Sequence, residues 1–162
     1  MKEKIISELK GRGIALDKIS EIVFTLQTPY FPYLTMEDCH EAIGAVLKKR
    51  EVQHAILTGL ALDVLAEKDM LPEPLLSIIK NDESLYGIDE ILALAITNVY
   101  GSIGLTSFGY LDKTKMGIIG ELNNVKHRQV NTFTDDLVAA IAAAASARIA
   151  HSARGDIAAS ED

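Results

Sequence analysis

The stretch Leu137-Val138-Ala139-Ala140-Ile141, followed by four alanines at 142–145, decides the fold. It is apolar on every side of a helix, whereas a surface helix carries polar residues on one face. Such a helix must be enclosed by other helices or by a partner subunit. A second stretch, Ile91-Leu92-Ala93-Leu94-Ala95-Ile96, has the same character. We therefore expect Leu137–Ala147 or Ile91–Val99 to form the centre of the protein.

Outward from these stretches, apolar residues recur at helical spacing, and no segment alternates as a strand does. We expect further helices at about residues 2–11, 17–27, 35–49, 51–68, 74–80 and 115–122. Thr35 and Asp38 approximate a capping box at the start of one of them. Gly101, Gly104 and Gly109 are interpreted as part of a Gly-rich connection. The prediction is an all-α protein, a bundle of about seven or eight helices with one apolar central helix surrounded by the others.

Length and charge narrow the class of protein further. The 162 residues fit a single helical domain at 1–152, with a flexible C-terminal tail at 153–162. The net charge of −7 excludes nucleic acid as the main partner, because backbone binding needs clustered Lys and Arg. With one cysteine, Cys39, no internal disulfide is possible. That cysteine usage and an N-terminus without a signal-peptide pattern lead us to expect a cytoplasmic protein.

Two apolar segments raise the question of membranes and of self-association. Residues 91–111 carry no charge and are long enough to span a bilayer, but their second half is rich in Gly, Ser and Thr. We interpret them as a buried helix and its connection. The alanines at 139–145 permit close helix approach, so we also predict a homo-oligomer.

Acidic pairs stand at the starts of both apolar stretches, Asp89-Glu90 before Ile91 and Asp135-Asp136 before Leu137. Acids in a first turn favour the helix dipole and cap free N–H groups, so capping is one interpretation. Adjacent residues point roughly 100° apart, however, so one of each pair should face the interior. Unpaired buried carboxylates are costly, and a divalent cation would relieve them. All-oxygen ligands suit Mg²⁺ or Mn²⁺, and the pattern leaves a metal site and capping both open.

A third acid lies in the segment Phe108-Gly109-Tyr110-Leu111-Asp112-Lys113-Thr114-Lys115. By itself Asp112 fits the N-cap of the following short helix. Lys113 and Lys115 are candidates to bind an anionic group such as a phosphate. Lys126-His127-Arg128 is a further short basic cluster that could meet a phosphate.

Several other chemistries are disfavoured by missing motifs. The sequence has no Gly-Lys dipeptide for a Walker A loop, and no His-Glu-x-x-His or His-Asp motif for two classes of metallohydrolase. Cys39 is followed six residues later by Ala45, so the thiolate-plus-arginine phosphatase loop is absent.

Taken in order, the acidic segments resemble the phosphatidylglycerophosphatase A family, and more narrowly its short, soluble members from Gram-positive bacteria. Family members carry Asp-Glu opening an apolar helix, then Phe-x-x-x-Asp-x-x-Lys, then Asp-Asp-hydrophobic-hydrophobic-Ala. The matching residues, within about 85–150, are Asp89-Glu90, then Phe108 with Asp112 and Lys115, then Asp135-Asp136-Leu137-Val138-Ala139. The sequence departs at Gly109, where the family usually has arginine, and at Met116, where it has proline. It also lacks the N-terminal Gly/Ser/Pro-rich segment of the membrane-embedded members.

The resemblance implies Mg²⁺-dependent hydrolysis of a phosphomonoester, with phosphatidylglycerophosphate converted to phosphatidylglycerol. Asp89, Glu90, Asp135 and Asp136 would hold the metal ion, all four with Asp112 would be catalytic, and Lys113 and Lys115 would bind the substrate. The partner is then a phosphorylated small molecule or lipid head group, with peripheral membrane contact. We expect the five acids to converge on one cleft.

Two alternatives to this activity remain. A catalytically silent relative that binds a metal or a partner is favoured by the missing arginine and Gly/Ser/Pro-rich segment. An all-helical nucleotide pyrophosphohydrolase ranks third, because its usual Glu-x-x-Glu spacing is not given by Asp82-Glu83 and Asp89-Glu90.

Overall fold

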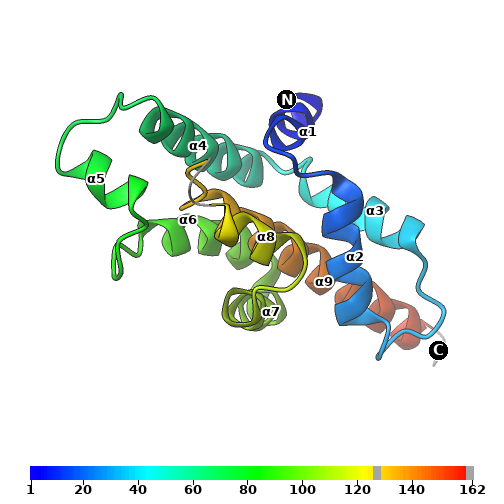
Figure 1. Cartoon of the computed structure of the whole chain (residues 1–162). Coiled ribbons are helices and arrows are strands. Elements are labelled where there is room, and N and C mark those ends of the chain that lie inside the picture. The colour runs from blue at the N-terminus through cyan, green and yellow to red at the C-terminus, as the bar shows by residue number, and fades with distance from the viewer. Residues whose placement is uncertain (126–128, 160–162) are drawn as a thin grey trace.

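Helices make up all of the regular secondary structure in the part of the chain that the computed structural model describes (Figure 1). That part comprises residues 1–125 and 129–159, with side chains as far as residue 152. The elements are α1 (Lys2–Gly11), α2 (Leu16–Gln27), α3 (Met36–Val46), α4 (Arg50–Glu67), α5 (Leu75–Lys80), α6 (Ile88–Thr97), the 3₁₀ helix η1 (Asn98–Tyr100), α7 (Gly101–Thr114), α8 (Ile118–Asn124) and α9 (Thr134–Ala159). The all-α prediction is confirmed. Nine α-helices in these residues compare with about seven or eight expected, and α5 and α8 are the shortest.

The central helix is α9. Every residue from Thr134 to Ala147 is buried, and α2, α3, α6 and α7 pack around this segment. Figure 1 shows α9 in orange running through the middle of the molecule, with α2 crossing its C-terminal part and α3 lying beside it. The other apolar stretch is less enclosed, since Ile91 remains 61% exposed. An alanine-rich helix suits the centre because its small side chains let several neighbours approach at once.

The capping box predicted at Thr35 is present at the start of α3. The Thr35 side chain accepts a hydrogen bond from the Asp38 N–H at 3.2 Å, and the Asp38 carboxylate accepts one from the Thr35 N–H at 2.8 Å. These reciprocal bonds satisfy two of the N–H groups left free at a helix start.

The prediction of a Gly-rich connection near residues 101–109 was wrong, because these residues form part of α7. Gly101 has φ +75° and turns the chain from η1 into the helix. Gly104 lies against α6, where a Cβ atom would come within 3.1 Å of the Thr97 carbonyl oxygen. The glycines therefore permit a tight turn and a close helix crossing instead of interrupting the helix.

Residues 88–114, which comprise α6, η1 and α7, are long and apolar enough to cross a membrane by length and composition alone. Only 28% of the most apolar window is buried inside the protein. The expectation of a buried helix therefore holds for one side, which includes Ala93, Ile96, Phe108 and Leu111.

Two predicted segments fall at the limits of the described residues. The backbone of 153–159, expected as part of a tail, continues α9, and residues 160–162 lie outside the described part. The basic cluster Lys126-His127-Arg128 also lies outside it.

Candidate active site

The start of α9 is capped by a carboxylate from another helix. Asp63 of α4 is fully buried. It accepts hydrogen bonds from the Phe133 N–H at 3.1 Å, the Thr134 N–H at 2.8 Å and the Thr134 hydroxyl at 2.6 Å. Burial raises the pKa of Asp63 to about 7, although the three hydrogen bonds oppose that rise. Asp63 thus joins α4 to the first turn of α9.

A second connection holds the segment just before α9. The Arg12 guanidinium, at the end of α1, lies 2.7 Å from Glu67 of α4 and donates to the Asn131 side-chain oxygen at 3.0 Å. Glu67 also accepts a hydrogen bond from the Val130 N–H at 3.0 Å. Residues 130–134 are therefore fixed by α1 and α4 before the chain enters the central helix.

Carboxylates from α7 and α9 meet around the ammonium group of Lys115. The Lys115 Nζ atom lies 2.9 Å from Asp112 Oδ1, 3.3 Å from Asp135 Oδ2 and 4.0 Å from Asp136 Oδ1. Asp135 and Asp136 are almost completely buried, whereas the side chain of Asp112 remains 34% exposed. We call these four residues, together with Asp89, whose charge acts on Asp136, the carboxylate cluster.

The backbone around Lys115 directs its side chain toward α9. Lys115 ends α7 in the left-handed conformation, with φ +51°. A Cβ atom on Gly120 would lie 2.5 Å from the Lys115 carbonyl oxygen, so only glycine lets α8 pack so closely against this turn. The turn between α7 and α8 thereby fixes the place of the only cation that contacts the cluster within the described residues.

Negative charge in the cluster exceeds what Lys115 neutralises. Burial and then the charge of Asp135 raise the pKa of Asp136 to about 9, with Asp112 and Asp89 adding to the effect. Burial raises the pKa of Asp135 to about 6, although Lys115 lowers it. Burial alone would lower the pKa of Lys115, but the neighbouring aspartates raise it on balance. Asp136 is therefore the carboxyl of the cluster whose negative charge is most strongly disfavoured.

Asp89 of α6 belongs to the same electrostatic group. Its pKa is raised by burial and then by the charges of Asp82 and Asp112, and its own charge acts on Asp136. Glu90 behaves differently, since its side chain is exposed and only its N–H bonds to Asp89 Oδ1, at 3.0 Å. Lys113 is also exposed. The structure therefore brings together Asp112, Asp135, Asp136 and Lys115, adds Asp89 only through the effect of its charge, and leaves Glu90 and Lys113 on the surface.

The cluster has the chemistry of a site for a hard divalent cation. Among the described residues, no three His, Cys, Asp or Glu side chains stand in an arrangement that would hold a metal ion together. The Lys115 ammonium instead lies among the carboxylates. Asp89, Asp135 and Asp136 nevertheless offer only oxygen donors, which Mg²⁺ and Mn²⁺ prefer. A cation would relieve the repulsion that raises their pKa values, so the donor chemistry of these residues, though not their present arrangement around Lys115, suits such an ion.

Fold and site together define a protein that is helical throughout its described elements, with a partly buried carboxylate cluster at the start of its central helix. The family model described as phosphatidylglycerophosphatase A matches residues 5–151. The chain therefore belongs to the phosphatidylglycerophosphatase A family.

Similar proteins come from Bacillus and Listeria species. The Bacillus subtilis protein YutG is 53% identical over 154 residues, which cover 95% of this chain and 93% of YutG. Among solved structures, a protein of unknown function from Bacillus stearothermophilus is 56% identical with a TM-score of 0.91, covering 94% of this chain and 95% of its own. The low temperature requirement C protein from Listeria monocytogenes is 54% identical, also with a TM-score of 0.91, covering 94% and 96%. The fold is thus shared by close relatives over nearly the whole chain.

Proposed function

We propose that this protein hydrolyses the terminal phosphomonoester of phosphatidylglycerophosphate, releasing phosphatidylglycerol and inorganic phosphate. The observation that carries the proposal is the placement of the Lys115 ammonium among Asp112, Asp135 and Asp136. A fixed cation beside acids that can bind a metal ion is an arrangement suited to a phosphoryl group. Membership of the phosphatidylglycerophosphatase A family supports the choice of substrate.

Asp89, Asp135 and Asp136 would hold a divalent cation, with Mg²⁺ or Mn²⁺ suited to the oxygen donors. When bound, this ion would polarise the phosphoryl oxygens and offset charge that develops during the reaction. Lys115 would contact the phosphate through its ammonium group. We place the reaction in the cytoplasm, with the protein in peripheral contact with the membrane that carries the substrate.

Asp112 is the residue we assign to the attacking water, because it is the most accessible carboxylate beside Lys115. The water oxygen forms a bond to phosphorus as the bond between phosphorus and the glycerol oxygen breaks. Asp112 takes a proton from the water, and the departing glycerol oxygen takes one from solvent.

The direct test measures phosphate release by the purified protein from phosphatidylglycerophosphate in mixed micelles, with Mg²⁺, with Mn²⁺ and with a chelator. We expect release that needs the metal and is lost in Asp135→Asn. The matched control is Asp17→Asn, because the Asp17 side chain is 76% exposed on α2. Parallel reactions with a soluble phosphomonoester and with nucleoside triphosphates separate the alternatives. Pyrophosphate release from a triphosphate would replace the proposal with a pyrophosphohydrolase, and inactivity on all substrates would indicate a silent relative.

A further inference from the structure

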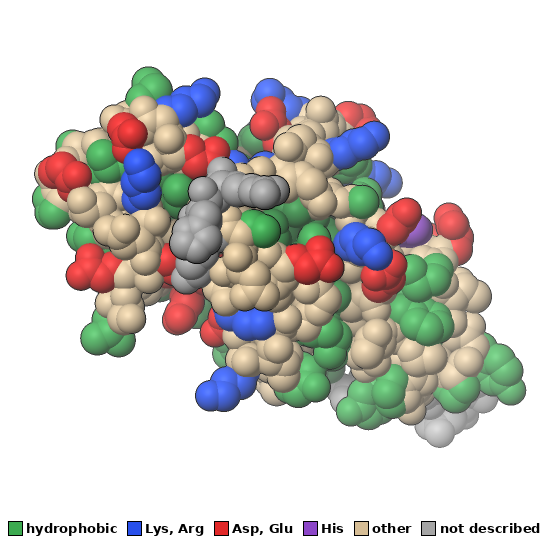
Figure 2. All heavy atoms as spheres, in the orientation of Figure 1, with side chains coloured by type: hydrophobic (Ala, Val, Ile, Leu, Met, Phe, Trp, Pro, Cys, Tyr) green, Lys and Arg blue, Asp and Glu red, His purple; other side chains and the backbone are tan. Residues whose placement is uncertain are grey.

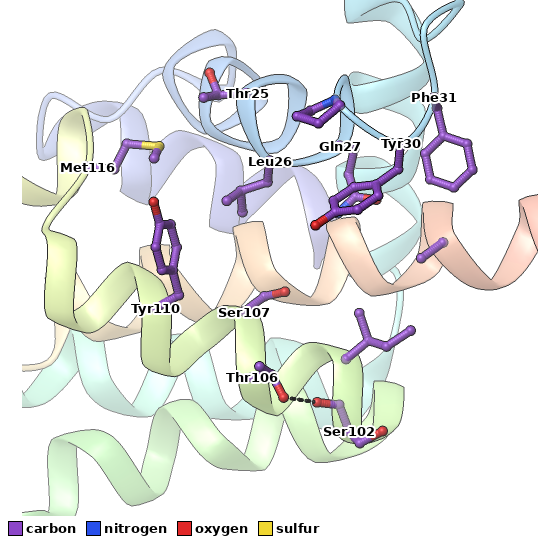
Figure 3. Close-up of a pocket in the computed structure, with 13 residues that line it drawn as sticks. Thr25, Leu26, Gln27, Tyr30, Phe31, Ser102, Thr106, Ser107, Tyr110 and Met116 are labelled. Carbon is purple, nitrogen blue, oxygen red and sulfur yellow. Dashed lines mark hydrogen bonds between the residues drawn. The ribbon is translucent and has the colours of Figure 1, made fainter.

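A groove of about 780 Å³ lies between α2 with its following loop and α7, and crosses α9 at Ala150 (Figure 3). Figure 3 shows Leu26 and Thr25 of α2 on one side, and Ser107 and Tyr110 of α7 on the other. The volume lies within the range of roughly 300–1,000 Å³ that small-molecule sites occupy. None of the residues used for the carboxylate cluster lines this groove.

The lining of the groove is uncharged. No Asp, Glu, Lys, Arg or His is among the lining residues, although 24% of the chain is charged. The hydroxyl groups of Thr25 and Thr106 donate to the carbonyl oxygens of Glu21 and Ser102, at 2.8 and 2.9 Å, so their own helices satisfy them. The ligand that suits this surface is a hydrocarbon chain, which gains free energy by leaving water and asks for no polar partner.

Two exposed tyrosine side chains line the groove, and a third lies in the adjoining loop. Tyr30 is 75% exposed and Tyr110 is 52% exposed, and both line the groove. Tyr33, in the same loop as Tyr30, is 95% exposed. Figure 2 shows hydrophobic side chains gathering at this end of the molecule, without red or blue spheres among them. Tyrosine is favoured at boundaries between water and lipid because its ring is apolar and its hydroxyl is polar.

The groove and the carboxylate cluster share two helices. In the last turns of α7, Tyr110 and the following Met116 line the groove, whereas Asp112 and Lys115 belong to the cluster. Along α9, Ala150 follows Asp135 by fifteen residues, a distance of about 22 Å at ~1.5 Å per residue. One acyl chain spans about half of the ~30 Å hydrocarbon core of a bilayer. In phosphatidylglycerophosphate, two glycerol units and a phosphodiester separate the acyl chains from the terminal phosphate, so the molecule is long enough to pass around the end of α7.

We propose that this groove binds an acyl chain of the lipid whose terminal phosphate is hydrolysed at the carboxylate cluster. This inference rests on the proposed function. The acyl chain leaves the bilayer surface beside Tyr30 and Tyr110 and lies between α2 and α7. The head group passes Met116 toward Lys115.

The kinetic test fills the groove from each wall. Ser107→Trp acts from α7 and Thr25→Phe from α2, and the open volume has room for either side chain. The control is Ser7→Trp, the same substitution at an exposed position of α1 that does not line the groove. We expect both groove variants to raise KM for the long-chain lipid about tenfold, the effect of roughly two methylene groups left unburied. The value of kcat/KM for the chain-free glycerophosphoglycerophosphate head group should stay within twofold of the wild type. Equal effects on the two substrates, or no effect on either, would overturn the inference.

A binding measurement separates this inference from the proposed function. Dihexanoyl phosphatidylglycerol, titrated into ¹⁵N-labelled protein, should shift amide signals of α2 and α7 near Thr25 and Ser107, and Ser107→Trp should weaken these shifts. Such shifts without any phosphatase activity would support the groove while ending the proposed function. Activity without such shifts, and with equal rates on lipid and head group, would overturn the assignment of the groove and leave the proposed function standing. Sedimentation showing a dimer that Ser107→Trp dissociates, with lipid kinetics unchanged, would assign the groove to a second copy and overturn the inference.

Discussion

Two helices of this protein begin with adjacent acids, and their surroundings differ. In α9, Asp135 and Asp136 are 6% and 4% exposed, and Asp63 and Lys115 approach from other helices. In α6, Asp89 is half-buried, Glu90 is exposed, and Gly87 provides no side-chain cap. The same sequence pattern therefore produces a charged centre at one helix and a mostly solvated turn at the other. The difference arises because the neighbouring helices bury Asp135 and Asp136 and place Lys115 beside them.

The largest effect should follow from Asp136→Asn. We expect activity to fall by ~10²–10³-fold, because an anionic ligand is lost while the size of the side chain is kept. Mg²⁺ should no longer raise the melting temperature of this variant. Phosphate release and thermal melting with and without Mg²⁺ measure both effects. If Asp136 were only a helix cap, activity would persist and stability would fall by about 1 kcal/mol or less.

Lys115→Met should have the next largest effect, because it leaves the three surrounding carboxylates without their cation. We expect activity to fall about 100-fold and the metal-free protein to lose about 1–3 kcal/mol. That loss is smaller than for a fully buried pair, because the Lys115 side chain is 30% exposed. Mg²⁺ should restore more stability to this variant than it adds to the wild type. Lys113→Met is the matched control, and a comparable loss there would contradict the assignment.

Substitutions of the two acids of α6 should have different effects on activity. Asp89→Asn should lower activity about tenfold, since Asp89 interacts electrostatically with Asp112 and Asp136. Glu90→Gln should change activity less than about twofold, because its side chain is exposed and outside the cluster. Steady-state kinetics at saturating Mg²⁺ compare them. A loss in Glu90→Gln as large as in Asp89→Asn would show that Glu90 is a ligand in the working enzyme.

The smallest effect is the pH dependence of stability without metal. A carboxyl whose pKa is higher in the folded state binds its proton more tightly there, so its folded form is favoured at low pH. For Asp135 and Asp136 this contribution is complete below about pH 4 and is lost as pH rises through about 6 and about 9. The melting temperature should therefore fall between pH 6 and 9 in chelator. Asp136→Asn or Mg²⁺ should flatten the upper part of that fall, and a wild-type melting temperature that does not change over this range would refute it.

A structural feature could be predicted from the sequence where the residues that cause it lie close together along the chain. The enclosure of α9 and the acids at its start follow from residues adjacent along the chain, and the order of the acidic segments indicated the family. Asp63 was missed because its partners, Phe133 and Thr134, are some seventy residues away. The sequence did hold a sign of its role, because Asp63 is an acid on the same helical stripe as Ile56 and Leu60, which are both buried.

Other misses have similar causes. Arg12 and Glu67, which fix the segment before α9, stand in ordinary polar surroundings of the sequence. Gly104 was interpreted as part of a connection because glycine marks a loop and a close helix crossing equally well in sequence. Only the neighbouring Thr97 carbonyl distinguishes the two uses.

The position of Lys115 has a consequence for how the protein matures. In small zinc domains the ligands repel one another until the metal arrives, so folding waits for the ion. Here a lysine attached to the chain already partly balances the acids, and hydrogen bonds from α1 and α4 hold the start of α9 without any ion. The polypeptide can thus complete its fold without a metal, and the proposed metal ion could exchange without unfolding. Chelation should abolish the proposed phosphatase activity and leave the helical circular dichroism spectrum unchanged.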